Sequence, residues 1–556
     1  MSKSCKNCSA AFEDTKEDLE FYDRVSPVIN GIKYPIPAPT LCPDCRLQRR
    51  LVWRNEKSLY RNKCDKTGQE IISWIAPDKP QKTYKKDVWW GDTWDARSYG
   101  RDFDFERPFF DQLEELIKEV PWLDMLTDNT FNSDYVNYCN NAKDCYLIYA
   151  SNNNESCMYS SYIWDCDDCI DCLQAFDCEL CYSCIDVNNC YGCKYSKNCT
   201  NCNNCTFCEN CQGCNDCFGC VNLVNKKYCF QNEQLTKEEY EKKLAEMQLD
   251  SYAKTKEIRE FFAKHRLEFP MRFAQIVNCE NCTGNALRNS SNTQEAYDSS
   301  DIEDSKWVMI GADVRDCYDI SGCEKLELCY NTVVVGIPAT RVLFSAYTWK
   351  GINEVLYSVL SPGAQNCFGC ASLYKGQYCI LNKQYTKQQY EQLVPKIIEY
   401  MQKTGEWGEF FPATLSPFDY NETIANDHFP MSREQVLAKG WRWRDADKKE
   451  YMPTDYQLPD SITEASDEVL QQICGCETCG KNYKIIAPEL KFYKRHNIPV
   501  PKKCSDCRHE DRMKMRNPNR LHSRSCAKCG CEIKTTYAPS KPEIVYCESC
   551  YLKEIY

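Results

Sequence analysis

Histidine and long apolar runs are what this sequence most clearly lacks. Only five histidines occur among 556 residues, and none lies in a recognisable catalytic motif. Because no stretch of 18 or more apolar residues is present, we expect no transmembrane helix and no membrane partner. The opening residues MSKSCKNCSAAF contain no apolar signal-peptide core, so we expect a protein that stays in the cytoplasm.

Positive charge is also in deficit. The chain has 69 Lys and Arg against 81 Asp and Glu, a formal net charge of −12. Such a balance argues against a protein that coats nucleic acid over its whole surface. Residues 481–525 are a local exception, with 13 Lys and Arg against four Asp and Glu. A basic patch within an acidic chain therefore remains a candidate interface.

Cysteine, by contrast, is abundant, with 43 residues. A chain of this length does not need disulfides to hold a small core together. A reducing cytoplasm keeps thiols reduced, and C-x2-C spacing there indicates metal ligands. We therefore expect metal-bound and buried thiols rather than a secreted disulfide framework.

Three sets of paired C-x2-C turns predict three metal sites. Two such turns can close a tetrahedron of thiolates around Zn²⁺, and four ligands leave no open position for catalysis. Cys474 and Cys531 lie beside these turns, and either could replace a neighbour as ligand. The predicted zinc ligands are Cys5, Cys8, Cys42 and Cys45; Cys476, Cys479, Cys504 and Cys507; and Cys526, Cys529, Cys547 and Cys550.

The first two sets are followed by matching basic segments. CPDCRLQRRLVWRN resembles CSDCRHEDRMKMRN, and on a helix the arginines of each would share one face. Guanidinium groups suit phosphate, and an aromatic pair nearby could stack on an unpaired base. The alternative is a solvated helix whose arginines pair with the protein's own carboxylates. The candidate nucleic-acid contacts are Arg46, Arg50, Arg54, Arg508, Arg512, Arg516, Phe492 and Tyr493.

A period of three runs through the middle of the chain. Twenty cysteines lie from Cys139 to Cys229, and every spacing is a multiple of three. This period fits neither a helix at 3.6 nor a flat strand at 2. It predicts a narrow, β-helix-like solenoid in which every third residue points inward, with about 12 residues per coil by analogy with repeat proteins. A coil of about 18 residues is the alternative. The pattern recurs more weakly over 311–335 and 343–379, which predicts a second module.

Eight consecutive inward positions would form a column of thiols. The thiols could simply pack as small apolar groups, could form inner disulfides, or could bind a soft metal such as Zn²⁺ or Cu⁺ or an iron–sulfur cluster. The spacing alone leaves these three interpretations open. The column is Cys199, Cys202, Cys205, Cys208, Cys211, Cys214, Cys217 and Cys220.

Together these patterns predict a mostly β protein: two cysteine-rich solenoid modules with helical caps, flanked by zinc ribbons. Thr236 with Glu239, and Thr386 with Gln389, are capping boxes that begin the two cap helices. The predicted segments are ribbon 1 with a basic helix (1–56), an aromatic and acidic connection (57–135), solenoid module 1 (136–232), a capping helix (233–270), solenoid module 2 (271–383), a second capping helix (384–402), a loop-rich connector (403–470), ribbon 2 with a basic helix (471–522) and ribbon 3 (523–556).

Several blocks of the chain resemble a known group of proteins. They are RNKCDKTGQEIIS around Cys64, FDFERPFFDQ, the NCFGC endings, GEWGEFFP with LSPFDYNET, and the terminal CAKCG and YCESCY. The chain resembles uncharacterised, cysteine-rich multi-zinc-ribbon proteins of small-genome bacterial lineages. Its ribbons resemble a probable zinc-ribbon module, C-x2-C…FY…P-x2-C-x2-C-R. The resemblance covers most of the chain and implies a cytoplasmic bacterial protein, but it implies little about activity.

These observations favour a non-catalytic scaffold whose ribbons and basic helices engage nucleic acid or a protein–RNA assembly. A thiol-rich protein that stores or buffers soft metal is the alternative. A weaker alternative is an enzyme that uses the acidic, tryptophan-rich loop of Asp92, Asp95, Asp102 and Asp104. No oligomeric state is predicted.

Overall fold

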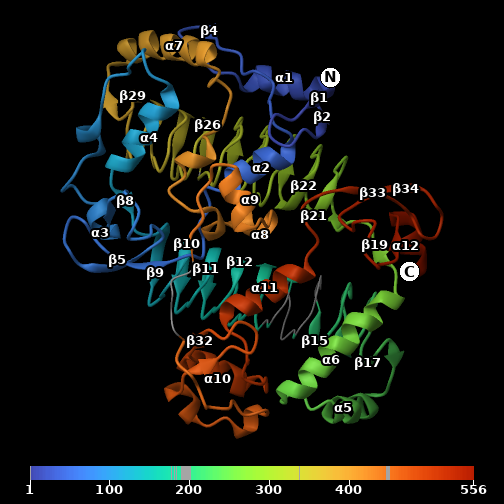
Figure 1. Cartoon of the computed structure of the whole chain (residues 1–556). Helices are drawn as coiled ribbons and strands as arrows, with labels where there is room; N and C mark the ends of the chain where they lie inside the picture. The colour runs from blue at the N-terminus through green and yellow to red at the C-terminus, as the bar shows by residue number, and fades with distance from the viewer. Residues whose placement is uncertain are drawn as a thin grey trace. The chain divides into compact units, whose positions relative to one another are not determined.

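The computed structural model describes residues 2–176, 178–180, 182, 185–188, 194, 202–336, 338–445 and 451–555. Helices and strands take up similar shares, 26% and 27%, so the fold is mixed and not mostly β as expected. The strands of the described residues belong to many small sheets, with no closed barrel among them. The chain divides into two units (Figure 1): unit 1 is Met1–Met125, Ala274–Asp445 and Asn519–Leu521, and unit 2 is Leu126–Phe273, Ala446–Pro518 and His522–Tyr556.

Unit 2 contains two stacks of short parallel strands, and Figure 1 shows the first of them as a row of parallel arrows. Neighbouring strands pair with a shift of twelve residues, as in Asn137 with Tyr149. The last pair of the second stack turns back as an antiparallel hairpin. The strands are β9 (Thr127–Phe131), β10 (Asn137–Lys143), β11 (Tyr149–Glu155), β12 (Ser161–Trp164), β13 (Leu173–Phe176) and β14 (Ile185–Asn188), then β15 (Asn203–Thr206), β16 (Asn215–Phe218), β17 (Cys229–Phe230) and β18 (Glu233–Gln234).

Unit 1 repeats this arrangement with a three-stranded and an eight-stranded sheet. The shift between parallel neighbours stays close to twelve, as in Val314 with Leu326. It thus matches the shorter of the two coil lengths expected from the sequence. The strands are β20 (Ile276–Val277), β21 (Gly284–Arg288) and β22 (Ala296–Ser300), then β23 (Ile302–Glu303), β24 (Val314–Arg315), β25 (Leu326–Glu327), β26 (Ala339–Leu343), β27 (Ile352–Leu356), β28 (Gln365–Phe368), β29 (Cys379–Ile380) and β30 (Lys383–Gln384).

The period of three is a property of the backbone. The residue before each inward position has a positive φ, as in Tyr138 (55°), Asn141 (50°) and Asp144 (53°). A left-handed residue turns the chain sharply, and asparagine and aspartate accept this conformation better than most residues. Four three-residue edges account for the twelve-residue shift. The polar residues between the cysteines therefore make the corners.

The corners are joined from one coil to the next by side-chain amides. Asn129 Nδ2 donates to Asn141 Oδ1 at 2.7 Å, and Asn141 Nδ2 donates to Asn153 Oδ1 at 2.7 Å. The ladder continues from Asn153 to Asp165 at 3.0 Å. Each bond spans twelve residues, so these ladders hold the strand register on the outer surface.

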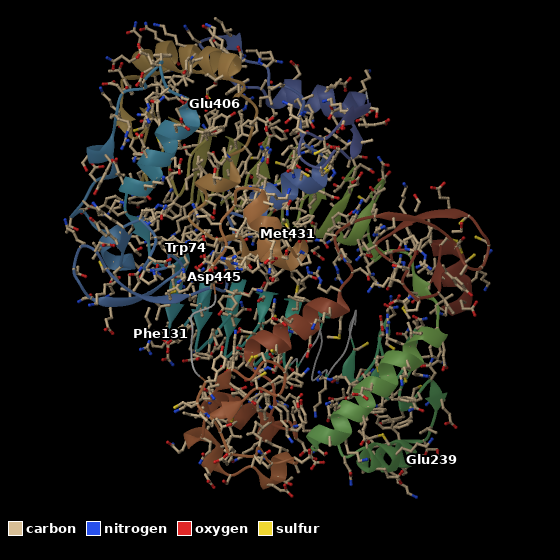
Figure 2. The ribbon with its side chains drawn as sticks, viewed as in Figure 1. Trp74, Phe131, Glu239, Glu406, Met431 and Asp445 are labelled. Atoms are coloured by element: carbon tan, nitrogen blue, oxygen red, sulfur yellow. The ribbon has the colours of Figure 1, made fainter. Side chains whose placement is uncertain are left out.

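Helices follow the strand stack in each unit. Both predicted capping boxes are present, Thr236 with Glu239 at α5 and Thr386 with Gln389 at α7; Glu239 is labelled in Figure 2. α7 buries four apolar residues and a tyrosine along one side. The helices concerned are α5 (Lys237–Glu246), α6 (Tyr252–His265) and α7 (Lys387–Thr404).

The other long helices lie near cysteine turns, except α4. In unit 1 Glu406, labelled in Figure 2, accepts hydrogen bonds from the Phe109 and Phe110 amides at the start of α4 (3.0 and 2.8 Å). Among the described residues, no helix is both long and apolar enough to cross a membrane. These helices are α1 (Lys16–Val25), α2 (Pro43–Leu51), α4 (Phe109–Glu119), α10 (Ala487–Arg495), α11 (Ser505–Met515) and α12 (Glu548–Ile555).

The remaining elements are short. They are β1 (Ser2–Ser4), β2 (Ala11–Glu13), β3 (Val28–Ile29), β4 (Ile32–Lys33), β5 (Tyr60–Lys63), β6 (Glu70–Ser73), β7 (Thr83–Tyr84), β8 (Trp122–Leu123), β19 (Met271–Arg272), β31 (Cys474–Gly475), β32 (Asn482–Tyr483), β33 (His522–Ser525), β34 (Glu532–Thr535), β35 (Val545–Tyr546), α3 (Lys86–Trp89), α8 (Ile424–His428), α9 (Arg433–Ala438) and the 3₁₀ turns Ala96–Tyr99, Arg266–Glu268, Ala413–Leu415, Tyr420–Glu422, Ile462–Glu464 and Asp467–Gln471.

Candidate metal centres and the arginine contacts

Three groups of four cysteines could each hold a metal ion, and in each group the four sulfurs lie within 4.8 Å of one another. Clusters 1 and 2 are the predicted sets. Cluster 3 contains Cys531 in place of the predicted Cys550. The groups are Cys5, Cys8, Cys42 and Cys45 (cluster 1), Cys476, Cys479, Cys504 and Cys507 (cluster 2), and Cys526, Cys529, Cys531 and Cys547 (cluster 3).

The change in cluster 3 follows from a tight turn. The Cys526 amide donates to the Cys531 carbonyl at 2.8 Å, and Gly530 between them has φ 77°. This turn brings the Cys531 sulfur beside the first two. Cys550 still interacts with Cys526, Cys529 and Cys547. Five thiols therefore surround a position that needs four, while the other spare, Cys474, does not join cluster 2.

The backbone around the clusters favours thiolates. The Cys42 amide donates to Cys5 Sγ at 3.3 Å, and the Cys547 amide donates to Cys526 Sγ at 3.2 Å. A hydrogen bond from the Cys45 thiol is the main cause that lowers the pKa of Cys42 to about 5. Deprotonated sulfur is the form that binds a soft metal.

The predicted arginines in and just after α2 do not face solvent. Arg46, Arg50 and Arg54 are 1%, 0% and 2% exposed. Arg46 Nε lies 2.7 Å from Asp319 Oδ2, and Arg50 Nη1 lies 3.2 Å from Asp319 Oδ1. Arg54 pairs with Glu56 at 2.5 Å. The predicted phosphate contacts by these three side chains are therefore wrong, because the arginines neutralise carboxylates inside unit 1.

The arginines of α11 behave in the same way inside unit 2. Arg508 Nε lies 2.9 Å from Asp171 Oδ2, and Arg512 Nη1 lies 2.8 Å from Asp171 Oδ1. Both side chains are less than a tenth exposed. Phe492 and Tyr493 are also buried, so neither can stack on a base as predicted. Arg516 is half-buried.

The arginine–aspartate contacts of the two units have the same geometry. Asp171 and Asp319 both have a positive φ, 58° and 78°, and both stand at a corner of a strand stack. An aromatic residue lies twelve positions before each aspartate, and an arginine stacks over its ring. The guanidinium carbon of Arg508 lies 4.7 Å from the centre of the Tyr159 ring, and that of Arg46 lies 4.6 Å from the centre of the Trp307 ring. Each helix thus fits an aromatic–aspartate step of a neighbouring stack.

Burial shifts the pKa of charged side chains at both arginine contacts. Loss of water lowers the pKa of Arg50 to about 10, although Asp319 opposes the change. Burial also raises the pKa of the Glu489 carboxyl, which accepts hydrogen bonds from Tyr493 (2.8 Å) and Tyr159 (2.9 Å). The contacts are therefore held by charges that have little access to solvent.

The thiol column is buried and hydrogen-bonded to the backbone. Cys205 Sγ lies 3.5 Å from the Asn203 carbonyl and 3.4 Å from the Cys214 carbonyl. The same pair of contacts recurs at Cys208, Cys211, Cys214, Cys217 and Cys220. Ser151 makes the same bond to its own strand, to the Tyr149 carbonyl at 2.7 Å. Seven of the eight predicted positions, Cys202 to Cys220, are at most 1% exposed, and Cys199 lies outside the described residues.

Inward side chains also accept hydrogen bonds. The Ile163 amide donates to Ser151 Oγ at 3.2 Å, and the Cys329 amide donates to Cys317 Sγ at 3.3 Å. A small side chain that can both donate and accept therefore suits these positions. All described cysteines are free thiols, and no column cysteine belongs to the candidate metal groups of the described chain. This geometry favours packing over the disulfide and metal interpretations.

Three carboxylates of the acidic loop have separate partners. Asp95 pairs with Arg97 at 3.0 Å, and Asp102 pairs with Lys383 at 2.7 Å. Asp104 accepts a hydrogen bond from the Glu106 amide at 2.9 Å. In the described ranges, Asp92 and these three carboxylates are not brought together as ligands of one ion.

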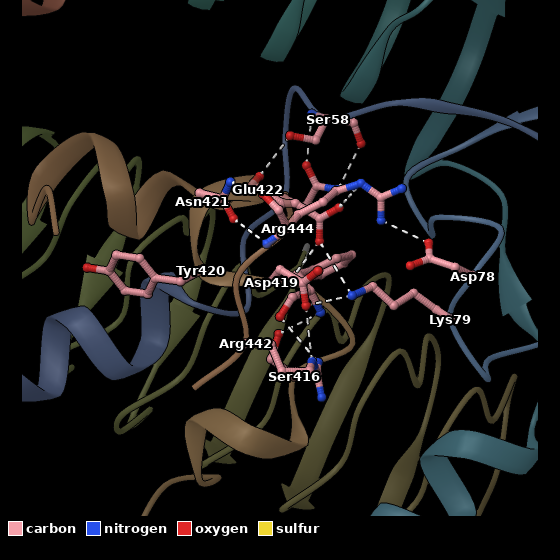
Figure 3. Close-up of polar contacts among 12 residues, drawn as sticks. Ser58, Asp78, Lys79, Ser416, Asp419, Tyr420, Asn421, Glu422, Arg442 and Arg444 are labelled. Atoms are coloured by element: carbon pink, nitrogen blue, oxygen red, sulfur yellow. Dashed lines mark hydrogen bonds and ion pairs between the residues drawn. The ribbon is translucent and has the colours of Figure 1, made fainter. Parts of the chain in front are cut away.

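A polar network in unit 1 was not anticipated (Figure 3). Lys79 Nζ lies 2.6 Å from Asp419 Oδ1, and Arg444 Nη1 lies 2.8 Å from Asp78 Oδ1. Burial raises the pKa of Glu422, which accepts a hydrogen bond from the Tyr60 hydroxyl. The network joins segments more than 300 residues apart, so no local sequence signal could have revealed it.

Comparison of the chain with protein-family models, with curated proteins and with solved structures found no match in any of the three.

Proposed function

We propose that this protein is a non-catalytic, zinc-binding scaffold of the reducing cytoplasm. The strand stacks would be two modules of a narrow β-solenoid. The zinc sites would hold α2 and α11 in place on these modules. Four thiolates are the ligand set of structural zinc, and they leave no open coordination position.

One observation carries the proposal. In clusters 1 and 2 the second cysteine pair begins a helix, and the arginine after the last ligand enters the stack. Arg46 follows Cys45 and contacts Asp319, while Arg508 follows Cys507 and contacts Asp171. A metal that fixes the first turn of the helix therefore also fixes the guanidinium group.

The energetic reason lies in burial. A buried charge that loses its partner costs about 3–5 kcal/mol, so such a pair stabilises a structure only when its geometry is rigid. Zinc binding contributes folding free energy outright in small ribbons. Metal binding and arginine docking would then stabilise each other.

A nucleic-acid or protein–RNA partner remains a second proposal with less support. Arg508 and Arg512 of α11, Arg46 and Arg50 of α2, and Arg54 just after α2 are buried against carboxylates. The basic segment 481–525 supports this proposal, because it contains exposed lysines such as Lys484 and Lys491. A salt-dependent gel shift that weakens in Lys484→Ala/Lys491→Ala would favour it.

The number of metal ions bound per chain distinguishes a zinc-binding scaffold from a metal-storage protein. Protein purified under reducing conditions should contain about three zinc ions per chain by elemental analysis, one for each four-cysteine group. A stoichiometry well above three would favour metal storage in the column. The absence of bound zinc in folded protein would contradict the scaffold proposal.

A further inference from the structure

Two segments at opposite ends of the chain have the same backbone. We call residues 60–90 the inner module and residues 522–552 the C-terminal module. In the inner module β5 pairs with β6, with Tyr60 opposite Ser73. In the C-terminal module β33 pairs with β34, with His522 opposite Thr535. Every paired residue of the first hairpin corresponds to the residue 462 positions later, and those later residues form the pairs of the second hairpin.

The turn of each hairpin is also the same. The Cys64 amide donates to the Gln69 carbonyl at 2.8 Å, as the Cys526 amide donates to the Cys531 carbonyl at 2.8 Å. The glycines at the equivalent position are left-handed, with φ 72° at Gly68 and 77° at Gly530.

The sulfur of the cysteine that begins this turn accepts the same hydrogen bond in both modules. The Lys85 amide donates to Cys64 Sγ at 3.3 Å, and the Cys547 amide donates to Cys526 Sγ at 3.2 Å. Cys64 therefore occupies the place of the first ligand of cluster 3.

The match extends beyond the hairpin. β7 of the inner module pairs in parallel with β8, with Thr83 opposite Trp122. β35 of the C-terminal module pairs in parallel with β19, with Met271 opposite Val545. A helix follows in each case, α3 from Lys86 and α12 from Glu548. The sequences agree at several of these positions, as in IAPDKP and YAPSKP.

The ligands, however, are missing from the inner module. Only Cys64 remains. The positions equivalent to Cys529, Cys531, Cys547 and Cys550 are held by Thr67, Gln69, Lys85 and Val88. Cys64 belongs to none of the candidate metal groups of the described residues. One thiol and a lysine cannot form a tetrahedral zinc site.

The inner module instead buries two tryptophans. Trp74 and Trp89 are 0% and 1% exposed, whereas their equivalents in the C-terminal module are Thr536 and Tyr551. The indole of Trp74 donates to the Leu123 carbonyl at 2.7 Å. Buried tryptophans supply apolar area that a small module otherwise lacks.

The polar network of Figure 3 fastens the same module. Asp78 and Lys79 belong to the loop after β6, and they contact Arg444 and Asp419 (2.8 and 2.6 Å). The guanidinium of Arg444 also lies 4.6 Å from the centre of the Tyr60 ring. These contacts hold the hairpin and its loop to a second segment of unit 1.

We infer that the inner module is a fourth ribbon of the same kind, which folds around tryptophans instead of a metal. That cluster 3 binds zinc rests on the proposed function. The equivalence of the two modules is independent of that proposal, since it depends on strand register, hydrogen bonds and sequence alone. Unit 1 would then hold one zinc ion and unit 2 two.

Matched serine variants of the full chain test this inference by elemental analysis. Cys64→Ser should keep about three zinc ions per chain, because Cys64 binds none. Cys526→Ser/Cys529→Ser should lose one ion, because of the five thiols around this position only Cys531, Cys547 and Cys550 remain. A loss of one ion in Cys64→Ser would overturn the inference. No loss in the double variant would instead refute the zinc site of cluster 3.

A second variant restores the ligands. Thr67→Cys/Lys85→Cys/Val88→Cys should bind one zinc ion more than the parent protein, because the backbone already has the required turns. Circular dichroism checks that the variant is folded. A folded variant with unchanged zinc content would show that the inner module is not a ribbon, and if the variant does not fold, the result for Cys64→Ser decides.

Discussion

Asp171 and Asp319 each hold two arginines in a place with almost no water. The carboxylate of Asp319 contacts Arg46 and Arg50, and all three side chains are at most 1% exposed. Two cations around one carboxylate leave a net positive charge, which polar partners help to disperse. The Asp319 carbonyl accepts from Arg50 at 2.7 Å, and Asn331 Oδ1 accepts from it at 3.1 Å.

Asp319→Ala should therefore lower the free energy of unfolding of unit 1 by about 3–5 kcal/mol, because it leaves two buried guanidinium groups unpaired. Urea denaturation followed by tryptophan fluorescence measures the change. Asp316→Ala is the matched control, since Asp316 pairs with Arg24 near the surface and should contribute less than about 1 kcal/mol. Equal effects of the two variants would contradict the role of the buried contact.

At the scale of the element, each coil of the stacks is built from corners. A left-handed residue every third position, joined to the next coil by an amide ladder, accounts for both the twelve-residue register and the polar residues between cysteines. The inward side chains are mostly small, with a few larger apolar residues such as Ile148 and Ile163, and the cysteines and serines among them also bond to the backbone.

Asn141→Val should destabilise unit 2 by about 1–2 kcal/mol, because a β-branched residue is strained at φ 50° and the ladder is interrupted. Asn140→Val is the control, since it lies in the same strand but is not a corner. Thermal denaturation compares the two variants. Asn141→Gly should lose less stability than Asn141→Val, and if the valine were tolerated equally at both positions, the corner explanation would be wrong.

At the scale of the whole molecule, each unit combines distant parts of the chain. Unit 1 joins the N-terminal cluster to the later strand stack, and unit 2 joins the two C-terminal clusters to the earlier one. Each unit thus combines cysteine clusters from one end of the sequence with the strand stack that lies farther from them in the sequence, and we call this the crossed arrangement. The division of the sequence into nine linear segments does not describe this arrangement and stays a prediction.

Loss of cluster 1 should therefore affect the second strand stack. Cys42→Ser/Cys45→Ser should reduce hydrogen-exchange protection in α2 and in β24 and β25 of unit 1, while the strands of unit 2 keep theirs. Cys504→Ser/Cys507→Ser should have the converse effect on α11 and on β12 and β13. Exchange measured by mass spectrometry tests both. Loss confined to the strands nearest in sequence would contradict the crossed arrangement.

Much of the local design could be predicted. The cysteine spacing predicted clusters 1 and 2, and the capping boxes predicted the starts of α5 and α7. The period of three predicted inward-facing positions, and the described cysteines of the column occupy them. Cluster 3 was correct for three of its four cysteines. In each case the signal lies within a few residues or repeats at a fixed interval.

The misinterpreted features depend on contacts between distant residues. The arginine stripes have the spacing of an exposed basic face, and nothing near Arg46 shows that Asp319 lies beside it. The constant interval between the inner and C-terminal modules was present in the sequence. It is not visible in the cysteine spacing, because the inner module has only Cys64 in common with the cysteines of the C-terminal module.

The sequence by itself determined the cysteine groups of clusters 1 and 2 and the three-residue period, because both depend on short spacings and on the conformations that asparagine, aspartate and cysteine allow. Only the tertiary structure decided that the arginines are buried, that the histidine-poor, cysteine-rich chain divides into two crossed units, and that tryptophans occupy the module without ligands. Those outcomes depend on burial and charge pairing between segments hundreds of residues apart, which local pattern does not encode.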